Sequence, residues 1–163
     1  MRFVVIGGDA AGMSAASRAR RKVTDLEVTV FEQTQDVSYS ACGMPYNIAE
    51  PDRPIEDLVV RPAHVFRDKA GIDLRLGHRV TTIDRENKRV SGLTTDKAPF
   101  QADYDKLLIA TGASPRVPDL PGFDRDGVLV LKSLEHGRQI KNYLAANEVR
   151  QVTLIGRRHI AMK

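Results

Sequence analysis

The sequence has 163 residues, of which 42% are hydrophobic and 28% charged, and this composition is typical of one ordinary globular domain. Its single cysteine excludes a disulfide scaffold, and no apolar run approaches the roughly 18 residues that a membrane helix needs. The 25 basic residues are interspersed with 21 acidic ones, and no aromatic residues alternate with the basic ones, so we expect no nucleic-acid surface. Because the first apolar stretch is too short for a signal peptide, we expect a reducing, cytoplasmic location.

The first elements predict a strand, a glycine turn, a helix and a second strand. Residues 2–6 form an unbroken apolar run typical of a buried parallel strand, and Gly7 and Gly8 end it. Residues 13–23, rich in Ala and Arg, predict a helix, and 26–31 predict the second strand. Together they make a βαβ unit of about 30 residues.

The middle of the chain predicts shorter elements. Residues 33–54 have loop composition, with a short helix expected near Cys42, and Pro62 suits the first position of a helix that reaches Lys69. Four short strands, expected to form a small antiparallel meander, are predicted at 72–76, 79–84, 89–92 and 99–102.

The C-terminal third of the sequence predicts a further strand of the parallel sheet, followed by a connection, a helix and a final strand. Residues 106–110 form another buried strand, and prolines in 115–121 indicate an extended connection. Ser133 can cap a helix that runs to Asn147, and a final strand is expected at 151–155. The pattern is that of an α/β fold with a parallel sheet and a β-meander crossover.

The loop Gly7–Gly12 carries the first chemical signal. It lies between a strand and a helix, where the helix N-terminus can hold a dinucleotide pyrophosphate. Asp9 stands where the middle glycine of G-x-G-x-x-G would fall. Glu32 ends the second strand, where a carboxylate can accept the hydroxyls of an adenosine ribose and repel a 2′-phosphate. This order of elements favours dinucleotide binding over a simple chain turn.

Cys42 is the second signal, because its neighbours are small, polar and aromatic rather than apolar. At the start of a helix the dipole favours the thiolate, which is the nucleophilic form. No second cysteine exists, so Cys42 would cycle through either a mixed disulfide with a small thiol or a sulfenic acid. A metal site is not expected, since the histidines show no ligand spacing with Cys42.

Three stretches together carry a family resemblance: 5–12, 38–46 and 104–115. They resemble the single-cysteine branch of the FAD-dependent pyridine nucleotide-disulfide oxidoreductases, which contains coenzyme A-disulfide reductases, NADH oxidases, NADH peroxidases and persulfide reductases. The resemblance implies an FAD/NAD(P)-binding, Rossmann-like three-layer domain. It also implies that electrons pass from NAD(P)H through FAD to Cys42 and then to a disulfide, persulfide or peroxide. Members commonly lack the middle glycine, so Asp9 fits the family.

The resemblance assigns further residues by position. Cys42 would be the catalytic thiol. The residues that would hold FAD are Gly7, Gly8, Asp9, Ala10, Ala11, Gly12, Glu32, Val80, Thr111, Gly112 and Ala113. The residues that would face a coenzyme A substrate are Ser14, Arg18, Arg21, Ser38 and Lys69. From the residues alone, two interpretations of Arg18 and Arg21 are equally supported: they could meet coenzyme A phosphates, or they could be ordinary solvated arginines of the helix.

The resemblance also implies that the chain is incomplete. Residues 1–148 would be the first segment of an FAD-binding domain, and 149–163 the start of an NAD(P)H-binding domain, in which Arg158 takes the place of the middle glycine. A parallel crossover needs a dozen or more residues, so this second unit could not close. The family's dimerisation domain, and hence its homodimer, would also be missing. The alternative function is therefore a non-catalytic FAD- or nucleotide-binding remnant without NADH-driven turnover.

Overall fold

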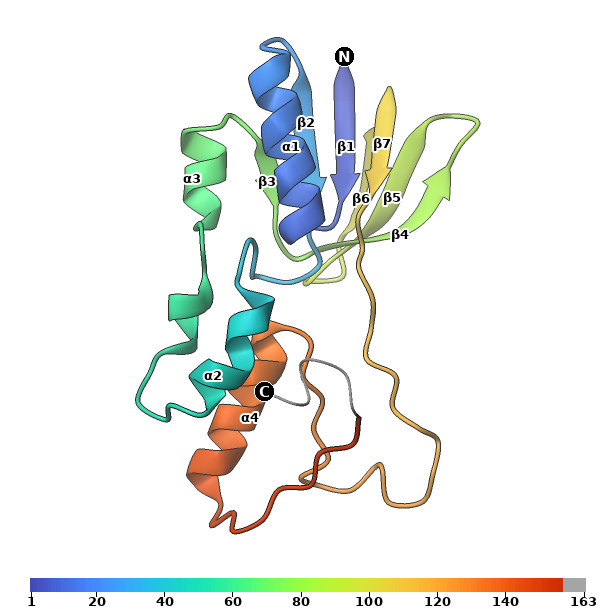
Figure 1. Cartoon of the computed structure of the whole chain (residues 1–163). Coiled ribbons are helices and arrows are strands. Elements are labelled where there is room, and N and C mark those ends of the chain that lie inside the picture. Colours follow the sequence, from blue (N-terminus) through green and yellow to red (C-terminus); the bar gives the residue numbers. More distant parts are fainter. Residues whose placement is uncertain (157–163) are drawn as a thin grey trace. The chain divides into compact units, whose positions relative to one another are not determined.

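The computed structural model describes residues 1–156 and contains two compact units (Figure 1). The sheet unit comprises Met1–Tyr39 and Val59–Gly112. The helical unit comprises Ser40–Leu58 and the chain from Ala113 onward. The expectation about Arg158 lies outside the described residues.

A parallel sheet forms the centre of the sheet unit. Its strands are β1 (Arg2–Ile6), β2 (Glu27–Phe31), β3 (Asp73–Arg75) and β7 (Lys106–Ile109), in the order β3-β2-β1-β7. Strand β1 pairs with β2 on one side and with β7 on the other, in parallel register on both. The apolar residues of β1 and β2 are buried except Phe3, which is partly buried, as expected for strands that are covered on both faces.

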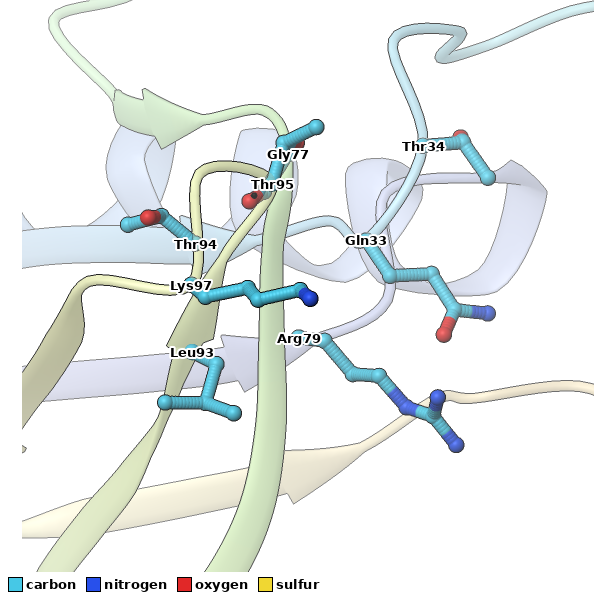
Figure 2. A pocket seen from close by; sticks show the side chains of 8 residues that line it. All are labelled: Gln33, Thr34, Gly77, Arg79, Leu93, Thr94, Thr95 and Lys97. Atoms are coloured by element: carbon cyan, nitrogen blue, oxygen red, sulfur yellow. Dashed lines mark hydrogen bonds between the residues drawn. The ribbon is translucent and has the colours of Figure 1, made fainter.

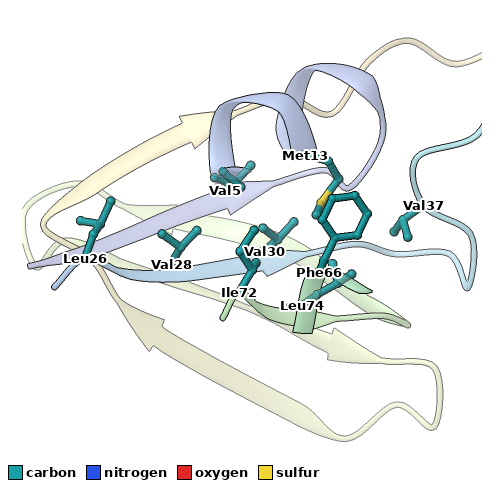
Figure 3. Close-up of a cluster of buried hydrophobic side chains, with 10 residues drawn as sticks. Val5, Met13, Leu26, Val28, Val30, Val37, Phe66, Ile72 and Leu74 are labelled. Atoms are coloured by element: carbon teal, nitrogen blue, oxygen red, sulfur yellow. The ribbon is translucent and has the colours of Figure 1, made fainter. Parts of the chain in front are cut away.

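Helices cover one face of this sheet. Helix α1 (Ala10–Lys22) buries Met13 and Ala16 against Val5 of β1, and α3 (Ala63–Asp68) adds Phe66 to the same cluster (Figure 3). Side chains alternate across a strand, so the residues on either side of Val5 must point to the opposite face.

A three-stranded meander covers that opposite face. It consists of β4 (His78–Asp84), β5 (Arg89–Thr94) and β6 (Pro99–Asp103), paired antiparallel. Its core residue is Val90, fully buried, which packs with Val4 and Ile6 of β1. Helices, parallel sheet and meander make the three layers, which confirms the fold class.

The helical unit holds the cysteine segment. It contains two 3-10 turns, η1 (Ala41–Gly43) and η2 (Ile55–Leu58), and two helices, α2 (Met44–Ile48) and α4 (Leu134–Ala146). Ser133 caps α4 as predicted: its hydroxyl accepts the N–H of His136, whose ring nitrogen accepts the N–H of Ser133.

Two strand predictions are wrong. Residues 72–76 do not join the antiparallel meander, because β3 pairs in parallel with β2 and so buries Ile72 and Leu74 in the helix-side cluster. Residues 151–155 form no strand and are exposed, since no neighbouring strand pairs with them in the described part of the chain.

Several element bounds also differ from prediction. Helix α1 begins three residues earlier than expected, at Ala10, because the helix starts directly from the glycine loop. Pro62 is the N-cap of α3 rather than its first helical residue. Cys42 lies in the turn η1, and the helix that follows begins only at Met44.

Candidate functional site: a dinucleotide loop and a cysteine segment

The turn from β1 into α1 depends on two glycines. Gly7 has a φ of 109°, which favours glycine, and a Cβ there would collide with the carbonyl oxygen of Ala110. A Cβ on Gly12 would collide with the carbonyl oxygen of Gly7. The sheet fixes this turn from both sides, because Gly7 donates its N–H to the Phe31 carbonyl at 2.8 Å and Ala110 donates to that of Ile6 at 2.8 Å.

The N-terminal turn of α1 remains uncapped by a side chain. The backbone of Asp9 is extended at the N-cap, but its carboxylate makes no capping hydrogen bond. Met13 donates to the Asp9 carbonyl at 2.9 Å, so the N–H groups of residues 10–12 precede the first intrahelical bond. Such a turn suits an anion, because its N–H groups and the helix dipole both favour negative charge.

Asp9 also has an unusual environment. Its Oδ1 atom is buried and has no hydrogen-bond partner within the described chain. Leaving a polar atom in this state costs free energy, and such atoms concentrate at binding sites. The small glycines and the uncapped helix turn fit the pyrophosphate end of a dinucleotide cofactor, whereas the Asp9 oxygen needs a hydrogen-bond donor.

Glu32 lies directly beside this loop, as predicted. Its side chain is only 9% exposed, and its Oε2 atom accepts the N–H of Gly8 at 2.7 Å. Its Oε1 atom accepts both the N–H and the hydroxyl of Thr34, each at 2.8 Å. The carboxylate is therefore held at the end of β2 in one orientation. Sequence reasoning missed Thr34, although a threonine hydroxyl that bonds the backbone two residues on, as Thr34 does with the Asp36 N–H, is a recognised local pattern.

Tyr39 is a second residue that sequence reasoning did not single out. Burial, followed by the negative charges of Asp9, Glu32 and Asp36, raises the pKa of its phenol to about 12. The phenol therefore stays neutral and keeps its proton near the acidic end of the loop. Its aromatic character and the surrounding carboxylates were visible in the sequence, but their proximity was not.

The second predicted flavin segment also reaches the loop. A Cβ on Gly7 would lie 3.3 Å from the Thr111 nitrogen, so the end of β7 passes close to the glycine turn. Gly112 has a φ of 68° and nothing within 4 Å of its Cβ position, while Ala113 begins the helical unit. Val80 lies half-buried on β4, where the pairing with β5 shifts between Val80 and Thr82.

A shallow pocket of ≈ 440 Å³ opens near the end of β2 (Figure 2). Its lining consists of mostly polar and cationic residues from the sheet unit, with one glycine and one leucine: Gln33, Thr34, Gly77, Arg79, Leu93, Thr94, Thr95 and Lys97. Thr34 both lines this pocket and binds Glu32, so the pocket adjoins the residue predicted to hold the ribose.

The predicted coenzyme A residues lie on the surface of the sheet unit. Ser14, Arg18 and Arg21 are exposed at helical spacing on α1, and Lys69 is the exposed C-cap of α3. Ser38 adopts a φ of 50°, and its N–H donates to the Gly8 carbonyl at 3.3 Å. The structure therefore brings Ser38 to the glycine loop.

Cys42 is a free thiol in the helical unit and is exposed. The turn that carries it is closed by the Gly43 N–H, which donates to the Ser40 carbonyl at 3.0 Å. A Cβ on Gly43 would lie 2.8 Å from a methyl group of Leu58, so a larger residue beside the cysteine would require the Leu58 side chain to shift. Exposure is what a nucleophile that meets a diffusing substrate requires.

The helix after the cysteine is anchored to α4 by an ammonium group. Lys141 Nζ lies within hydrogen-bond distance of three carbonyl oxygens, those of Asn47 at 3.1 Å, Glu50 at 2.8 Å and Arg53 at 2.7 Å. Asn47 itself is fully buried and donates to the Pro54 carbonyl at 2.9 Å. These bonds close the C-terminal end of α2, whose orphan carbonyls need donors.

Comparisons with known proteins agree with this arrangement. The family described as pyridine nucleotide-disulphide oxidoreductase matches residues 1–162. A relative from Pyrococcus abyssi, the NAD(P)H sulfur oxidoreductase (CoA-dependent), is 39% identical over 160 residues, which are 98% of this chain and 35% of the relative.

Solved structures show the same likeness. The water-forming NADH oxidase from Lactobacillus brevis, bound to NADH, has a TM-score of 0.90 and 29% identity over 99% of this chain and 36% of its own. The NAD-dependent persulfide reductase from A. fulgidus has a TM-score of 0.81 and 37% identity, covering 87% of this chain and 27% of its own.

The chain therefore belongs to the pyridine nucleotide-disulphide oxidoreductase family. This is a family of FAD- and NAD(P)H-dependent oxidoreductases, which confirms the expected enzyme class and cofactor types. The chain spans about a third of the length of the curated relatives that it matches. Within residues 1–156 no helix has the length and apolar character to span a bilayer, and no group of three or more potential ligands is placed to bind a metal ion.

Proposed function

We propose that this chain holds FAD through the Gly7–Gly12 loop and Glu32. The observation that carries the proposal is the Glu32 carboxylate, buried and hydrogen-bonded to the Gly8 amide of that loop at 2.7 Å. One carboxylate and one uncapped helix turn then lie side by side, as the ribose and the pyrophosphate of a dinucleotide require. Thr111, Gly112, Ala113 and Val80 complete the proposed cofactor residues.

Cys42 is the proposed catalytic thiol for a disulfide, persulfide or peroxide acceptor. With a disulfide, the Cys42 thiolate forms a bond to one sulfur and the other sulfur leaves as a thiolate. With a peroxide, the same sulfur takes up oxygen as a sulfenic acid and water or an alcohol leaves. Both outcomes are reversed by two electrons, which FAD supplies when it is bound and NAD(P)H has reduced it.

The basic side chains of α1 and α3 support a coenzyme A substrate. Arg18, Arg21 and Lys69 present exposed cations, the groups that bind phosphates of a coenzyme A thiol or disulfide. Ser14 and Ser38 would add hydroxyl groups. A relative whose name includes CoA dependence matches 98% of this chain, which also favours this substrate class.

We extend the proposal to the whole protein in the same terms. Residues 1–148 would be the first segment of an FAD-binding domain and 149–163 the start of an NAD(P)H-binding domain. The complete protein would act as a homodimer in a reducing, cytoplasmic compartment, without a nucleic-acid or membrane partner. A single exposed thiol is compatible with such a compartment.

Reconstitution with FAD tests the proposal. The purified 163-residue chain, incubated with FAD and then freed of unbound ligand, is expected to retain the visible absorbance band of a flavin. Glu32→Ala is expected to lose at least ten-fold in FAD affinity, since a charged acceptor for the ribose hydroxyls disappears. Glu27→Ala, at an exposed position of the same strand, is the matched control. A parent chain that retains no FAD would refute the proposal.

Incubation with a disulfide tests the role of Cys42. A coenzyme A mixed disulfide should form on the parent chain and be detected as added mass, and Cys42→Ser should give none. An equal yield from oxidised glutathione, which lacks the coenzyme A phosphates, would contradict the proposed substrate class. NADH consumption by the chain alone would show catalytic turnover. FAD binding without NADH consumption would instead support the non-catalytic remnant.

A further inference from the structure

The hydroxyl of Thr34 has two acceptors for one proton. Its oxygen lies 2.8 Å from Glu32 Oε1 and 3.1 Å from the carbonyl oxygen of Asp36. Because a hydroxyl carries a single hydrogen, it donates to one of these acceptors at a time. The same oxygen lies 3.4 Å from the Asp36 amide nitrogen, so it can accept that N–H in either orientation. Rotation of one bond therefore moves the proton from the carboxylate to the carbonyl.

The number of donors at Glu32 makes this rotation necessary for ribose binding. A carboxylate offers about four lone-pair positions. Three are filled, by the Gly8 N–H on Oε2 and by the Thr34 N–H and hydroxyl on Oε1. A ribose diol brings two more donors, one more than the carboxylate can still accept. The two N–H donors belong to the backbone, so the Thr34 hydroxyl is the donor that can turn away.

We propose that Thr34 is a positioning residue whose hydroxyl occupies Glu32 Oε1 in the cofactor-free chain and turns to the Asp36 carbonyl when a ribose hydroxyl of FAD takes its place. This inference rests on the proposed function. The exchange keeps both Glu32 oxygens hydrogen-bonded in either state, which a carboxylate at only 9% exposure requires. Thr34 thereby keeps the free chain's ribose acid satisfied at little cost to binding.

This exchange of hydrogen bonds determines whether removal of the Thr34 hydroxyl strengthens or weakens FAD binding. Removing the hydroxyl costs the free chain a hydrogen bond to the charged carboxylate, whereas it costs the FAD-bound chain only the weaker hydrogen bond to the neutral Asp36 carbonyl. Thr34→Val should therefore bind FAD about five-fold more tightly, which corresponds to about 1 kcal/mol, the difference between a hydrogen bond to a charged acceptor and one to a neutral acceptor. A threonine that merely supported the fold would lower the stability of both states equally.

The experiment uses the full chain as parent, Thr34→Val and Thr34→Ser, each with and without FAD. Thr34→Val should melt at a lower temperature than the parent without FAD, and the difference in melting temperature should be smaller with saturating FAD. Its dissociation constant for FAD should be lower, while Thr34→Ser, which keeps the hydroxyl, should resemble the parent. An FAD analogue whose adenosine ribose lacks both hydroxyls should bind Thr34→Val no more tightly than the parent.

Each outcome decides the question. Equal or weaker FAD binding by Thr34→Val overturns the inference and leaves the proposed function intact, provided that the parent binds FAD. A Thr34→Val chain that folds only when FAD is present supports the inference, because the loss of stability is then confined to the FAD-free state. A variant that stays unfolded in both conditions overturns it, as does equal tightening for the analogue. A parent that binds no FAD overturns both proposals.

Discussion

Gly12 and Gly112 differ in why a larger residue would be unfavourable. At Gly12 the obstacle is a steric clash, and at Gly112 it is the backbone conformation. Gly12→Ala would place a methyl group against the Gly7 carbonyl, and the Gly7 backbone is held in place by its hydrogen bond to Phe31. Overpacking of this kind costs about 1–3 kcal/mol, against the roughly 1 kcal/mol that Ala gains over Gly in a helix. We therefore expect a net loss of up to about 2 kcal/mol in urea unfolding, together with weaker FAD binding.

Gly112→Ala is the comparison for this prediction. Gly112 has a positive φ of 68° but nothing within 4 Å of its Cβ position. Its substitution should cost only the left-handed backbone, about 1 kcal/mol. A Gly12→Ala chain as stable as the parent would show that the turn can widen, and the requirement for glycine there would be withdrawn.

Tyr39 gives the sheet unit a sensitivity to alkaline pH. Its folded pKa is raised from 10.0 to about 12, first by burial and then by Asp9, Glu32 and Asp36. The neutral phenol is thus favoured in the folded state. This contribution is fully present below pH 10 and is lost as the pH rises towards 12. Tyr39→Phe cannot ionise, so its free energy of unfolding should fall less than that of the parent between about pH 9 and about pH 11.

Urea unfolding of both chains across that range is the measurement. Other tyrosines and the lysines titrate alike in the two proteins, so the difference between the curves isolates Tyr39. Parallel curves would mean that the phenol has the same pKa in the folded and unfolded states. The half-exposed ring is partly screened by water, so the direction of the divergence is the decisive result.

Among the elements, the meander depends on ionic contacts along its edge. The Arg89 side chain donates to Asp103 at 2.6 Å, and this hydrogen bond, with further help from Arg2, lowers the pKa of Asp103 from 3.8. The resulting stability is present at neutral pH and is lost as the pH falls through the lowered value. Asp103→Asn should be less stable than the parent at pH 7, and the difference should vanish in strong acid. Asp96→Asn, at an exposed turn position, should show no such pH-dependent difference.

The ammonium of Lys141 stabilises the cysteine-bearing segment of the helical unit. Lys141→Met keeps the aliphatic stem but removes the donor to the carbonyls of Asn47, Glu50 and Arg53. Losing a charged donor to such groups costs about 1.5–3 kcal/mol, and hydrogen exchange should accelerate in residues 47–53. Asn142→Met, an exposed position on the same helix, is the control. Unchanged exchange after Lys141→Met would show that water replaces the ammonium there.

The helices and strands also show which parts of the fold could be predicted from the sequence and which could not. The βαβ unit was predictable because an unbroken apolar strand, a glycine turn and a helix are local patterns. Strand β3 was assigned to the wrong sheet because alternation at Ile72 and Leu74 is the same whether the partner strand is parallel or antiparallel. Its burial depends partly on pairing with β2, which lies more than forty residues earlier in the chain.

In the candidate site, too, local patterns could be predicted from the sequence and contacts between side chains could not. The glycine loop and Glu32 could be predicted because their spacing along one βαβ unit fixes their proximity. The contribution of Thr34 depends on side-chain rotamers, and the raised pKa of Tyr39 depends first on its burial and then on nearby carboxylates, among them Asp9 from another loop. Neither has a periodic signature. The exposure of Cys42 was suggested by its neighbours, whereas its anchoring through Lys141 joins residues about ninety positions apart.

For the molecule as a whole, cofactor binding should act as a stabiliser of the fold. A ligand that binds only the folded chain adds about 2.7 kcal/mol at a concentration one hundred times its dissociation constant. For a chain of this size, each kcal/mol raises Tm by roughly 2–4 °C. FAD at that excess should therefore raise Tm by about 5–11 °C, and the shift should grow with the logarithm of its concentration.

The identity of the ligand provides the control for this thermal shift. NADP carries a 2′-phosphate whose negative charge would be repelled by the buried Glu32 carboxylate. NADP should therefore shift Tm far less than FAD at the same concentration. Glu32→Gln removes the negative charge while keeping the shape of the side chain, and should narrow the difference between the two ligands. Equal shifts from FAD and NADP in the parent chain would show that the ribose does not contact Glu32, and would place the adenosine elsewhere on the sheet unit.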